Sequence, residues 1–189
     1  MSMTDPLTAP ARSSVNSTKQ DWFNTRSTEE KGAAIRTGIE ASTGDILAIQ
    51  DADMEYSPSA LPDLIGPILE DEADVVIGSR FIGQIEGMSW SHALANRTLS
   101  KLATLLSGQK ITDIMTGHKA FKTGLLKEML PDSQEFEIEV ELIMSAAMRK
   151  ARILEIPISY SYRRTGVAKI GWRHGISSLT LLLKLGLLR

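Results

Sequence analysis

Apolar residues recur along the chain in two periods, which predict alternating helices and strands. Spacing of three to four residues is typical of an amphipathic helix, and a short unbroken apolar run is typical of a buried parallel strand. The segments with helical spacing are residues 31–42, 58–69, 90–106, 123–130, 135–150 and 172–189. The runs that predict strands are residues 45–50, 73–79 and 151–160. Residues 80–89 follow neither period, so we expect a loop there.

The order of these elements indicates one α/β domain over residues 30–189. A strand, a helix and a strand succeed one another over residues 45–79, as in a βαβ crossover. Residues 1–29 are rich in Ser, Thr, Asn and Pro and lack an apolar period, which predicts a disordered or atypical N-terminal segment. A chain of 189 residues is long enough to build one sizeable core.

Three carboxylates, Asp51, Asp53 and Glu55, follow the apolar run on alternate positions. Ligands bind at the carboxyl ends of strands in open α/β sheets. Carboxylates crowded at such a place repel one another, and a hard cation such as Mg²⁺ or Mn²⁺ removes that cost while leaving positions for substrate phosphates. A loop that merely caps the helix beginning near Pro58 would explain one carboxylate but not three. The pattern therefore predicts a metal–phosphate site.

Composition narrows the choice of chemistry and compartment. The chain has no cysteine and only three histidines, which excludes disulfides and zinc–thiolate sites and favours a reducing compartment. Residues 149–189 hold nine Lys or Arg and one acidic residue, whereas the rest of the chain is acidic. This asymmetry indicates an anionic partner at the basic end, with a solvated basic helix as the alternative. We see no signal peptide pattern, which favours a cytoplasmic protein.

The last apolar stretch, LTLLLKLGLLR, is shorter than the roughly 20 residues needed to span a bilayer. Two placements fit it: packing as a core helix, or lying on a membrane surface beside the basic residues. The second would make the protein peripheral on the cytoplasmic membrane face.

Five blocks of sequence resemble family 2 glycosyltransferases, most closely the dolichyl- or polyprenyl-phosphate mannosyl- and glucosyltransferases. The blocks are KGAAIRTGIEASTGDILAIQDADMEYSP, ADVVIGSRF, NRTLSKLATLLSGQKITDIMTGHKAF, FEIEVEL and ILEIPISYSYRRTGVAKIGWRHG, in the family's order. The resemblance implies an α/β, Rossmann-like fold of the GT-A type, a nucleotide-diphospho-sugar transferase sheet with helices on both faces. It also implies an inverting transfer of a hexose from GDP-mannose or UDP-glucose to a polyprenyl or dolichyl phosphate.

The resemblance also assigns roles to individual residues. It implies that the donor diphosphate is held by Asp51, Arg164 and Lys169, with Asp51, Asp53 and Glu55 on the metal. It implies acceptor-phosphate contacts from Arg80, Arg97 and Ser100. Asp53, Asp113 and Glu139 are expected among the catalytic or site-lining acids. A phosphate acceptor is largely a dianion at neutral pH and needs no general base, which fits the lack of an obvious His–acid pair.

The family pattern begins with strands that have no counterpart before Lys31, so an N-terminally truncated domain is expected. Losing those strands would expose the edge of the strand at residues 45–50. The alternative function is therefore a catalytically impaired remnant that binds a phosphate or a partner, and a form completed by another chain or by homo-oligomerisation is left open. A phosphohydrolase with Asp51 as nucleophile fits less well, because Met54 and Glu55 follow its D-x-D stretch. We expect no nucleic-acid partner.

Overall fold

A computed structural model describes residues 31–162 and 172–187. The helices are Lys31–Ala41 (α1), Leu61–Leu69 (α2), Trp90–Ser107 (α3), Thr123–Met129 (α4), Ile138–Met148 (α5) and Trp172–Leu187 (α6). The strands are Ile46–Gln50 (β1), Val75–Glu86 (β2), His118–Lys122 (β3) and Ile153–Ser161 (β4), and a 3₁₀ turn, Pro58–Ala60 (η1), precedes α2. The predicted segment 1–29 lies outside the described residues.

All six predicted helices are present, with ends that local chemistry explains. The Ser89 hydroxyl caps α3 by accepting from the His92 amide, and Gly108 ends that helix with a positive φ of 74°. Ser57 caps the 3₁₀ turn ahead of α2 in the same way, accepting from the Ser59 amide. The helix predicted over residues 135–150 is shorter than expected, because α5 begins at Ile138.

The sheet differs from the expected one in a strand that sequence periodicity did not predict. Its order is β1-β3-β2-β4, and β3 pairs antiparallel with both β1 and β2. The expected crossover over residues 45–79 is thus right in direction, since β1 and β2 run the same way, but the two strands are not neighbours. β1 pairs antiparallel with β3, so the expectation of a buried parallel strand was wrong. Among the strands that the structure describes, only β2 and β4 pair in parallel.

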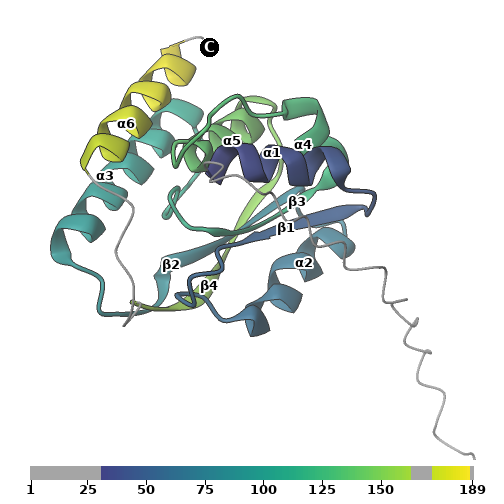
Figure 1. The fold of residues 1–189 in the computed structure, drawn as a ribbon, viewed down its shortest axis with the longest axis horizontal. Helices are drawn as coiled ribbons and strands as arrows, with labels where there is room; N and C mark the ends of the chain where they lie inside the picture. Colours follow the sequence, from purple (N-terminus) through teal and green to yellow (C-terminus); the bar gives the residue numbers. More distant parts are fainter. Residues whose placement is uncertain (1–30, 163–171, 188–189) are drawn as a thin grey trace, which may run out of the picture.

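Helices cover both faces of the sheet, as expected for this fold class. Figure 1 shows α2 alone on one side and α1, α4 and α5 together on the other, with α3 and α6 alongside. Val75, Ile77 and Phe121 face the larger helical layer and belong to the main core. Val76 and Ala120, the alternate residues, pack with Leu64 and Ile68 of α2 in a second core. β1 ends the described sheet, and its Ala48 is exposed, in line with the predicted open edge.

A bulge interrupts β2 where a loop was predicted. Regular pairing with β4 stops after Ser79 and resumes at Gln84, so residues 80–83 stand opposite Ile158 alone. Such bulges bend a strand and re-aim its side chains. The prediction of a loop over residues 80–89 was therefore wrong for residues 80–86, because β2 continues to Glu86, and right for residues 87–89, which connect β2 to α3.

Gly83 makes the bulge possible, because a Cβ there would overlap the backbone of Ile158. We expect Gly83→Ala to lower the free energy of unfolding by about 1–3 kcal/mol, since the β2–β4 pair would have to separate. Urea denaturation measures this. Gly66→Ala on α2 is the control, because a Cβ there meets nothing within 4 Å; it should be neutral or stabilising by up to about 1 kcal/mol. Equal effects of the two substitutions would contradict this account of the bulge.

Candidate active site

The acidic loop after β1 lies beside a cleft of about 700 Å³ at the carboxyl ends of β1, β2 and β4. Asp51, Glu55 and Tyr56 line it from the loop, and Tyr160 lines it from β4. The loop turns at Met54, which has a positive φ of 65° and a side chain that is 90% exposed. The Asp53 Oδ1 accepts a hydrogen bond from the Glu55 amide across this turn, 3.2 Å away. The loop therefore has a defined conformation that presents carboxylates beside a hollow.

Four alternating charges run from Asp51 into the core. The Lys31 Nζ lies 2.7 Å from Oδ1 and 2.9 Å from Oδ2 of Asp51, and 2.5 Å from Oε1 of Glu139. The other oxygen of Glu139 pairs with Lys119. The Lys119 ammonium also donates to the carbonyl of Thr116, 2.5 Å away. Helices α1 and α5 and strand β3 thus supply one member each of a network that ends on the first acid of the loop.

Burial and charge act against each other in this network. Burial raises the pKa of Asp51 above its usual range, and Lys31 opposes that shift. Burial would lower the pKa of Lys31, but Glu139 and Asp51 raise it above the usual lysine value. Burial would likewise raise the pKa of Glu139, yet Lys119 and Lys31 bring it below its usual range. Burial is the largest influence on Lys119 and lowers its pKa. The ion pairs therefore keep Glu139 charged in an almost water-free position.

The lack of a side chain at Gly117 leaves room for the Asp51 carboxylate. A Cβ at Gly117 would overlap the Asp51 carboxylate, and the three nearest atoms to that position all belong to Asp51. The Asp51 amide donates to the Gly117 carbonyl, and the Gly117 amide donates to the Tyr56 hydroxyl, each across 3.3 Å. The carboxylate thus packs directly against the backbone at the start of β3.

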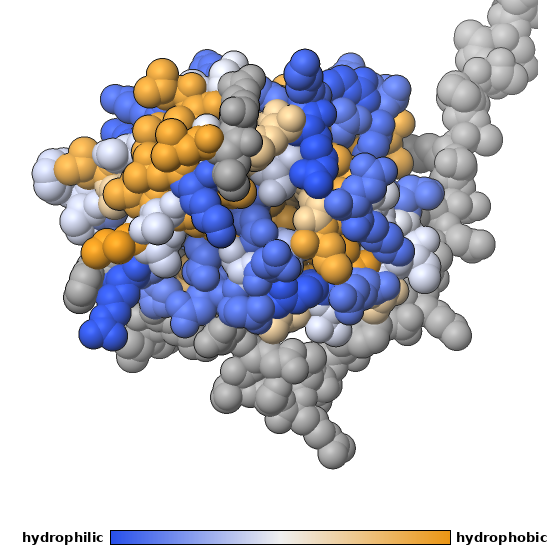
Figure 2. All heavy atoms as spheres, turned by 90° about the horizontal axis from the view of Figure 1, so that it is seen from above, coloured by the Kyte–Doolittle hydropathy of each residue, from blue (hydrophilic) through white to orange (hydrophobic). Residues whose placement is uncertain are grey.

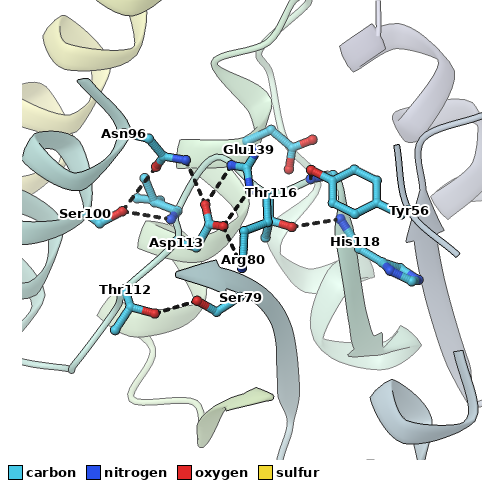
Figure 3. A network of polar contacts seen from close by, with 12 residues as sticks. Tyr56, Ser79, Arg80, Asn96, Ser100, Thr112, Asp113, Thr116, His118 and Glu139 are labelled. Carbon is cyan, nitrogen blue, oxygen red and sulfur yellow. Dashed lines mark hydrogen bonds and ion pairs between the residues drawn. The ribbon is translucent and has the colours of Figure 1, made fainter. Parts of the chain in front are cut away.

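A second polar cluster surrounds Asp113, which is fully buried (Figure 3). Arg80 donates to it three times: through Nε at 2.7 Å, through Nη2 at 2.8 Å and through its own amide at 3.0 Å. Asn96 of α3 adds a fourth donor at 2.8 Å. The amide of Asp113 itself donates to Glu155 of β4. Since Arg80 is the first residue of the bulge, the bulge turns its amide and its guanidinium toward this one carboxylate.

The predicted acceptor residues are unequal in their access to solvent. Arg80 is only 8% exposed, and its guanidinium lies 5.4 Å from the Tyr160 ring. Ser100 is 2% exposed; its hydroxyl accepts from the Ile114 amide and donates to Asn96. Arg97 is exposed and stacks over the Phe81 ring at 4.8 Å. Arg97 is therefore the one of the three that presents its charge at the surface.

The predicted metal ligands do not form a protein-only cage. Within residues 31–162 and 172–187, no group of three or more His, Asp or Glu side chains is placed to hold an ion. Asp51 is paired with Lys31, and the Glu55 carboxylate accepts a hydrogen bond from Tyr160. Mg²⁺ and Mn²⁺ commonly use one or two carboxylates together with substrate phosphates. Asp51 lines the cleft and fits such a shared site, whereas Asp53 is not among the residues that line it; the roles of Asp53 and Glu55 as ligands stay predictions.

Two predicted site residues are not described by the structure, and two buried polar residues were not predicted. Arg164 and Lys169 lie outside the described residues. Lys119 was missed, although a lysine inside the run HKAF is a signal, because a charge in a buried strand requires a partner. His118 is fully buried beside the Tyr56 ring, burial lowers its pKa, and neither ring nitrogen has a hydrogen-bond partner in the described part of the chain.

Comparison with known proteins identifies the family. Residues 3–130 match the model of glycosyl transferase family 2. The hexosyltransferase Agl6 of low-salt glycan biosynthesis in Haloferax volcanii is 32% identical over 76% of this chain and 36% of its own length. The undecaprenyl-phosphate mannosyltransferase of Micrococcus luteus is 27% identical over 79% of this chain and 70% of its own. The chain thus spans between about a third and 70% of the length of these two curated relatives.

Solved structures agree on the fold. Glucosyl-3-phosphoglycerate synthase from Mycobacterium tuberculosis, in complex with Mn²⁺, UDP-glucose and phosphoglyceric acid, superposes with a TM-score of 0.64 at 21% identity. The match covers 83% of this chain and 55% of that one. The predicted α/β, GT-A type glycosyltransferase fold is confirmed. The chain belongs to glycosyl transferase family 2.

The contact between Gly117 and Asp51 can be tested as a double-mutant cycle. We expect Gly117→Ala to lower the free energy of unfolding by about 1–3 kcal/mol, because the carboxylate and its pair with Lys31 must move. In an Asp51→Ala background the same substitution should cost little, since its obstacle is gone, giving a coupling energy of about 1 kcal/mol or more. Gly38→Ala on α1, where a Cβ meets nothing within 4 Å, is the control. Additive effects would show that Asp51 does not rest against Gly117.

Proposed function

We propose that this domain transfers a hexose from a nucleoside diphosphate sugar, GDP-mannose or UDP-glucose, to a polyprenyl or dolichyl phosphate with inversion at the sugar carbon. The observation that carries the proposal is the acidic loop beside the cleft, with Asp51 and Asp53 at the carboxyl end of β1 in a family 2 fold. The acceptor class is supported by a relative that is an undecaprenyl-phosphate mannosyltransferase.

On the donor side, Asp51 and Asp53 would hold Mg²⁺ or Mn²⁺ together with the diphosphate. The metal would supply positive charge to offset the charge that develops on the leaving group. Arg164 and Lys169 are proposed to add cationic contacts to the same phosphates. The described cleft, about 700 Å³ in volume, falls in the range of small-molecule sites.

On the acceptor side, Arg97 would make the first contact with the lipid phosphate, because its charge is at the surface and its orientation is fixed by the Phe81 ring. Arg80 lies deeper and is aimed by Asp113. Ser100 supports the cluster through Asn96 and the Ile114 amide. A bidentate arginine contact would orient a phosphate oxygen for attack, and the phosphate supplies the nucleophile without a general base.

The predicted catalytic acids divide into two kinds. Asp53 lies on the exposed turn and is proposed to act at the donor itself. Asp113 and Glu139 are buried and engaged by cations, so their contribution is proposed to be the orientation of Arg80 and Lys31. Removing either buried acid would leave an uncompensated cation, at a cost of about 3–5 kcal/mol.

The lipid acceptor implies contact with a membrane surface, and α6 offers a suitable face. Among the described residues no helix is long and apolar enough to cross a bilayer. Helix α6 instead exposes a stripe at spacings of three and four residues: Ile176, Leu179, Leu183 and Leu187. Figure 2 shows apolar side chains gathered on the side of the molecule where α3 and α6 lie in Figure 1. Lys184 provides a basic side chain on the same helix, as an interfacial helix requires.

Introduction of negative charge on this stripe tests the membrane contact. The double substitution Ile176→Glu and Leu183→Glu should reduce co-sedimentation with anionic lipid vesicles by about tenfold or more, because buried apolar area and attraction to the headgroups both fall. Leu69→Glu is the control, since Leu69 is an exposed leucine on α2, across the sheet. Unchanged sedimentation of the double variant would remove α6 as the contact surface.

Binding and transfer assays test the proposed reaction. Titration of the full chain with GDP and UDP should give binding that requires Mn²⁺, and Asp53→Asn should abolish this Mn²⁺-dependent binding. With undecaprenyl phosphate as acceptor, Arg97→Ala should keep nucleotide binding but lower kcat/KM for the lipid by about 10- to 100-fold, the worth of one charge-assisted contact. Lys101→Ala, one turn further along α3 and also exposed, is the matched control.

Absence of metal-dependent nucleotide binding at millimolar concentration would contradict the transferase. Retained binding of polyprenyl phosphate in that case would favour the alternative, a remnant that binds phosphate without transferring sugar.

A further inference from the structure

We propose that Lys31 occupies the metal-binding carboxylate of Asp51 until a nucleoside diphosphate arrives, so that the divalent cation and the diphosphate enter together. This inference rests on the proposed function and assigns a role to a residue that the family resemblance left without one. Lys31 is a positioning residue in this account, because it acts through Asp51.

The first observation is that both oxygens of Asp51 already have a cationic partner. The Lys31 Nζ is 2.7 Å from Oδ1 and 2.9 Å from Oδ2, so one ammonium contacts both oxygens. The Lys31 side chain is 15% exposed and that of Asp51 29% exposed, so water does little to weaken the pair. A metal that binds both oxygens of Asp51 must displace this ammonium, and one that binds a single oxygen must share the carboxylate with it.

The second observation is that the Lys31 ammonium has another anionic partner, Glu139, on the core side. The Glu139 Oε1 lies 2.5 Å from the Lys31 ammonium, and the other oxygen of Glu139 is paired with Lys119. The start of α1 is fixed as well, because the Gly32 amide donates to the Gln134 carbonyl at 2.6 Å and a Cβ at Gly32 would overlap the neighbouring backbone. Lys31 therefore remains at the edge of the site through Glu139 even when Asp51 changes partner.

Charge balance explains why the diphosphate is needed. Lys31, Lys119, Asp51 and Glu139 together are neutral, with two charges of each sign. The Asp53 carboxylate, the second proposed ligand, adds one negative charge near Asp51, so a divalent cation held by these two acids would leave an excess of one positive charge, which is unfavourable where water is scarce. A diphosphate brings compensating negative charge and offers oxygen acceptors to the displaced ammonium. Metal affinity should thus be low for the protein alone and high in the presence of the nucleotide.

Mn²⁺ binding to the full chain, followed by the electron paramagnetic resonance of free Mn²⁺, tests this idea. Without nucleotide, Lys31→Gln and Lys31→Met should bind Mn²⁺ about tenfold or more tightly than the natural protein, because Asp51 is released. Lys31→Arg, which keeps the charge, should bind as weakly as the natural protein. Lys122→Gln is the matched control, since Lys122 forms a Lys–Asp pair with Asp71 and Asp74 at the other end of β3.

Addition of GDP or UDP should tighten Mn²⁺ binding by the natural protein more than by the two neutral variants. Folding is checked by circular dichroism; both neutral variants leave Glu139 paired with Lys119, so no fully buried charge loses its last partner. Protein-only Mn²⁺ affinity that stays equal or falls in both neutral variants overturns the proposal. If the natural protein binds no nucleotide with Mn²⁺, the transferase proposal fails, while the protein-only comparison still decides the role of Lys31.

Discussion

The contact between Lys31 and Asp51 is the interaction on which the rest of the site depends. The Asp51 carboxylate lies between the Lys31 ammonium and the backbone of Gly117, and these two contacts set its position. The ammonium in turn depends on Glu139 of α5, and Glu139 depends on Lys119 of β3. Helices α1 and α5 and strand β3 thus meet at the Glu139 carboxylate, and Lys31 links this meeting point to Asp51, so the geometry of the acidic loop depends on how α1 and α5 pack against the sheet.

A similar principle organises the other polar cluster. The bulge in β2 removes residues 80–83 from regular pairing with β4. The amide and the side chain of Arg80 therefore both donate to Asp113. Both clusters place a buried acid behind a cation. In the proposed reaction this arrangement lets the protein present fixed positive charge to two phosphate-bearing substrates, with little reorganisation when they bind.

The amphipathic helices could be predicted because their signal is local. Helical spacing and caps such as Ser89 identify α3 and its neighbours from a short window of sequence. Strand β3 could not be found that way, since HKAF carries two polar residues whose burial is explained only by partners elsewhere. Lys119 meets Glu139, twenty residues along the chain, and His118 meets Tyr56. The resemblance pointed to Asp51, Asp113 and Glu139 and to Arg80, which pairs with Asp113, but it assigned no role to Lys31 or Lys119, which pair with Asp51 and Glu139.

One consequence follows from the place of β1 in the sheet. Within the described residues β1 is hydrogen-bonded on one side only, to β3, and its middle residue Ala48 faces solvent. An edge strand has fewer bonds to break, so its local opening requires less free energy than that of a central strand. The loop that carries Asp51, Asp53 and Glu55 is therefore attached to an edge strand of the described sheet. A ligand that binds both this loop and β4 across the cleft would raise the free energy needed to open β1, and so would stabilise this end of the sheet.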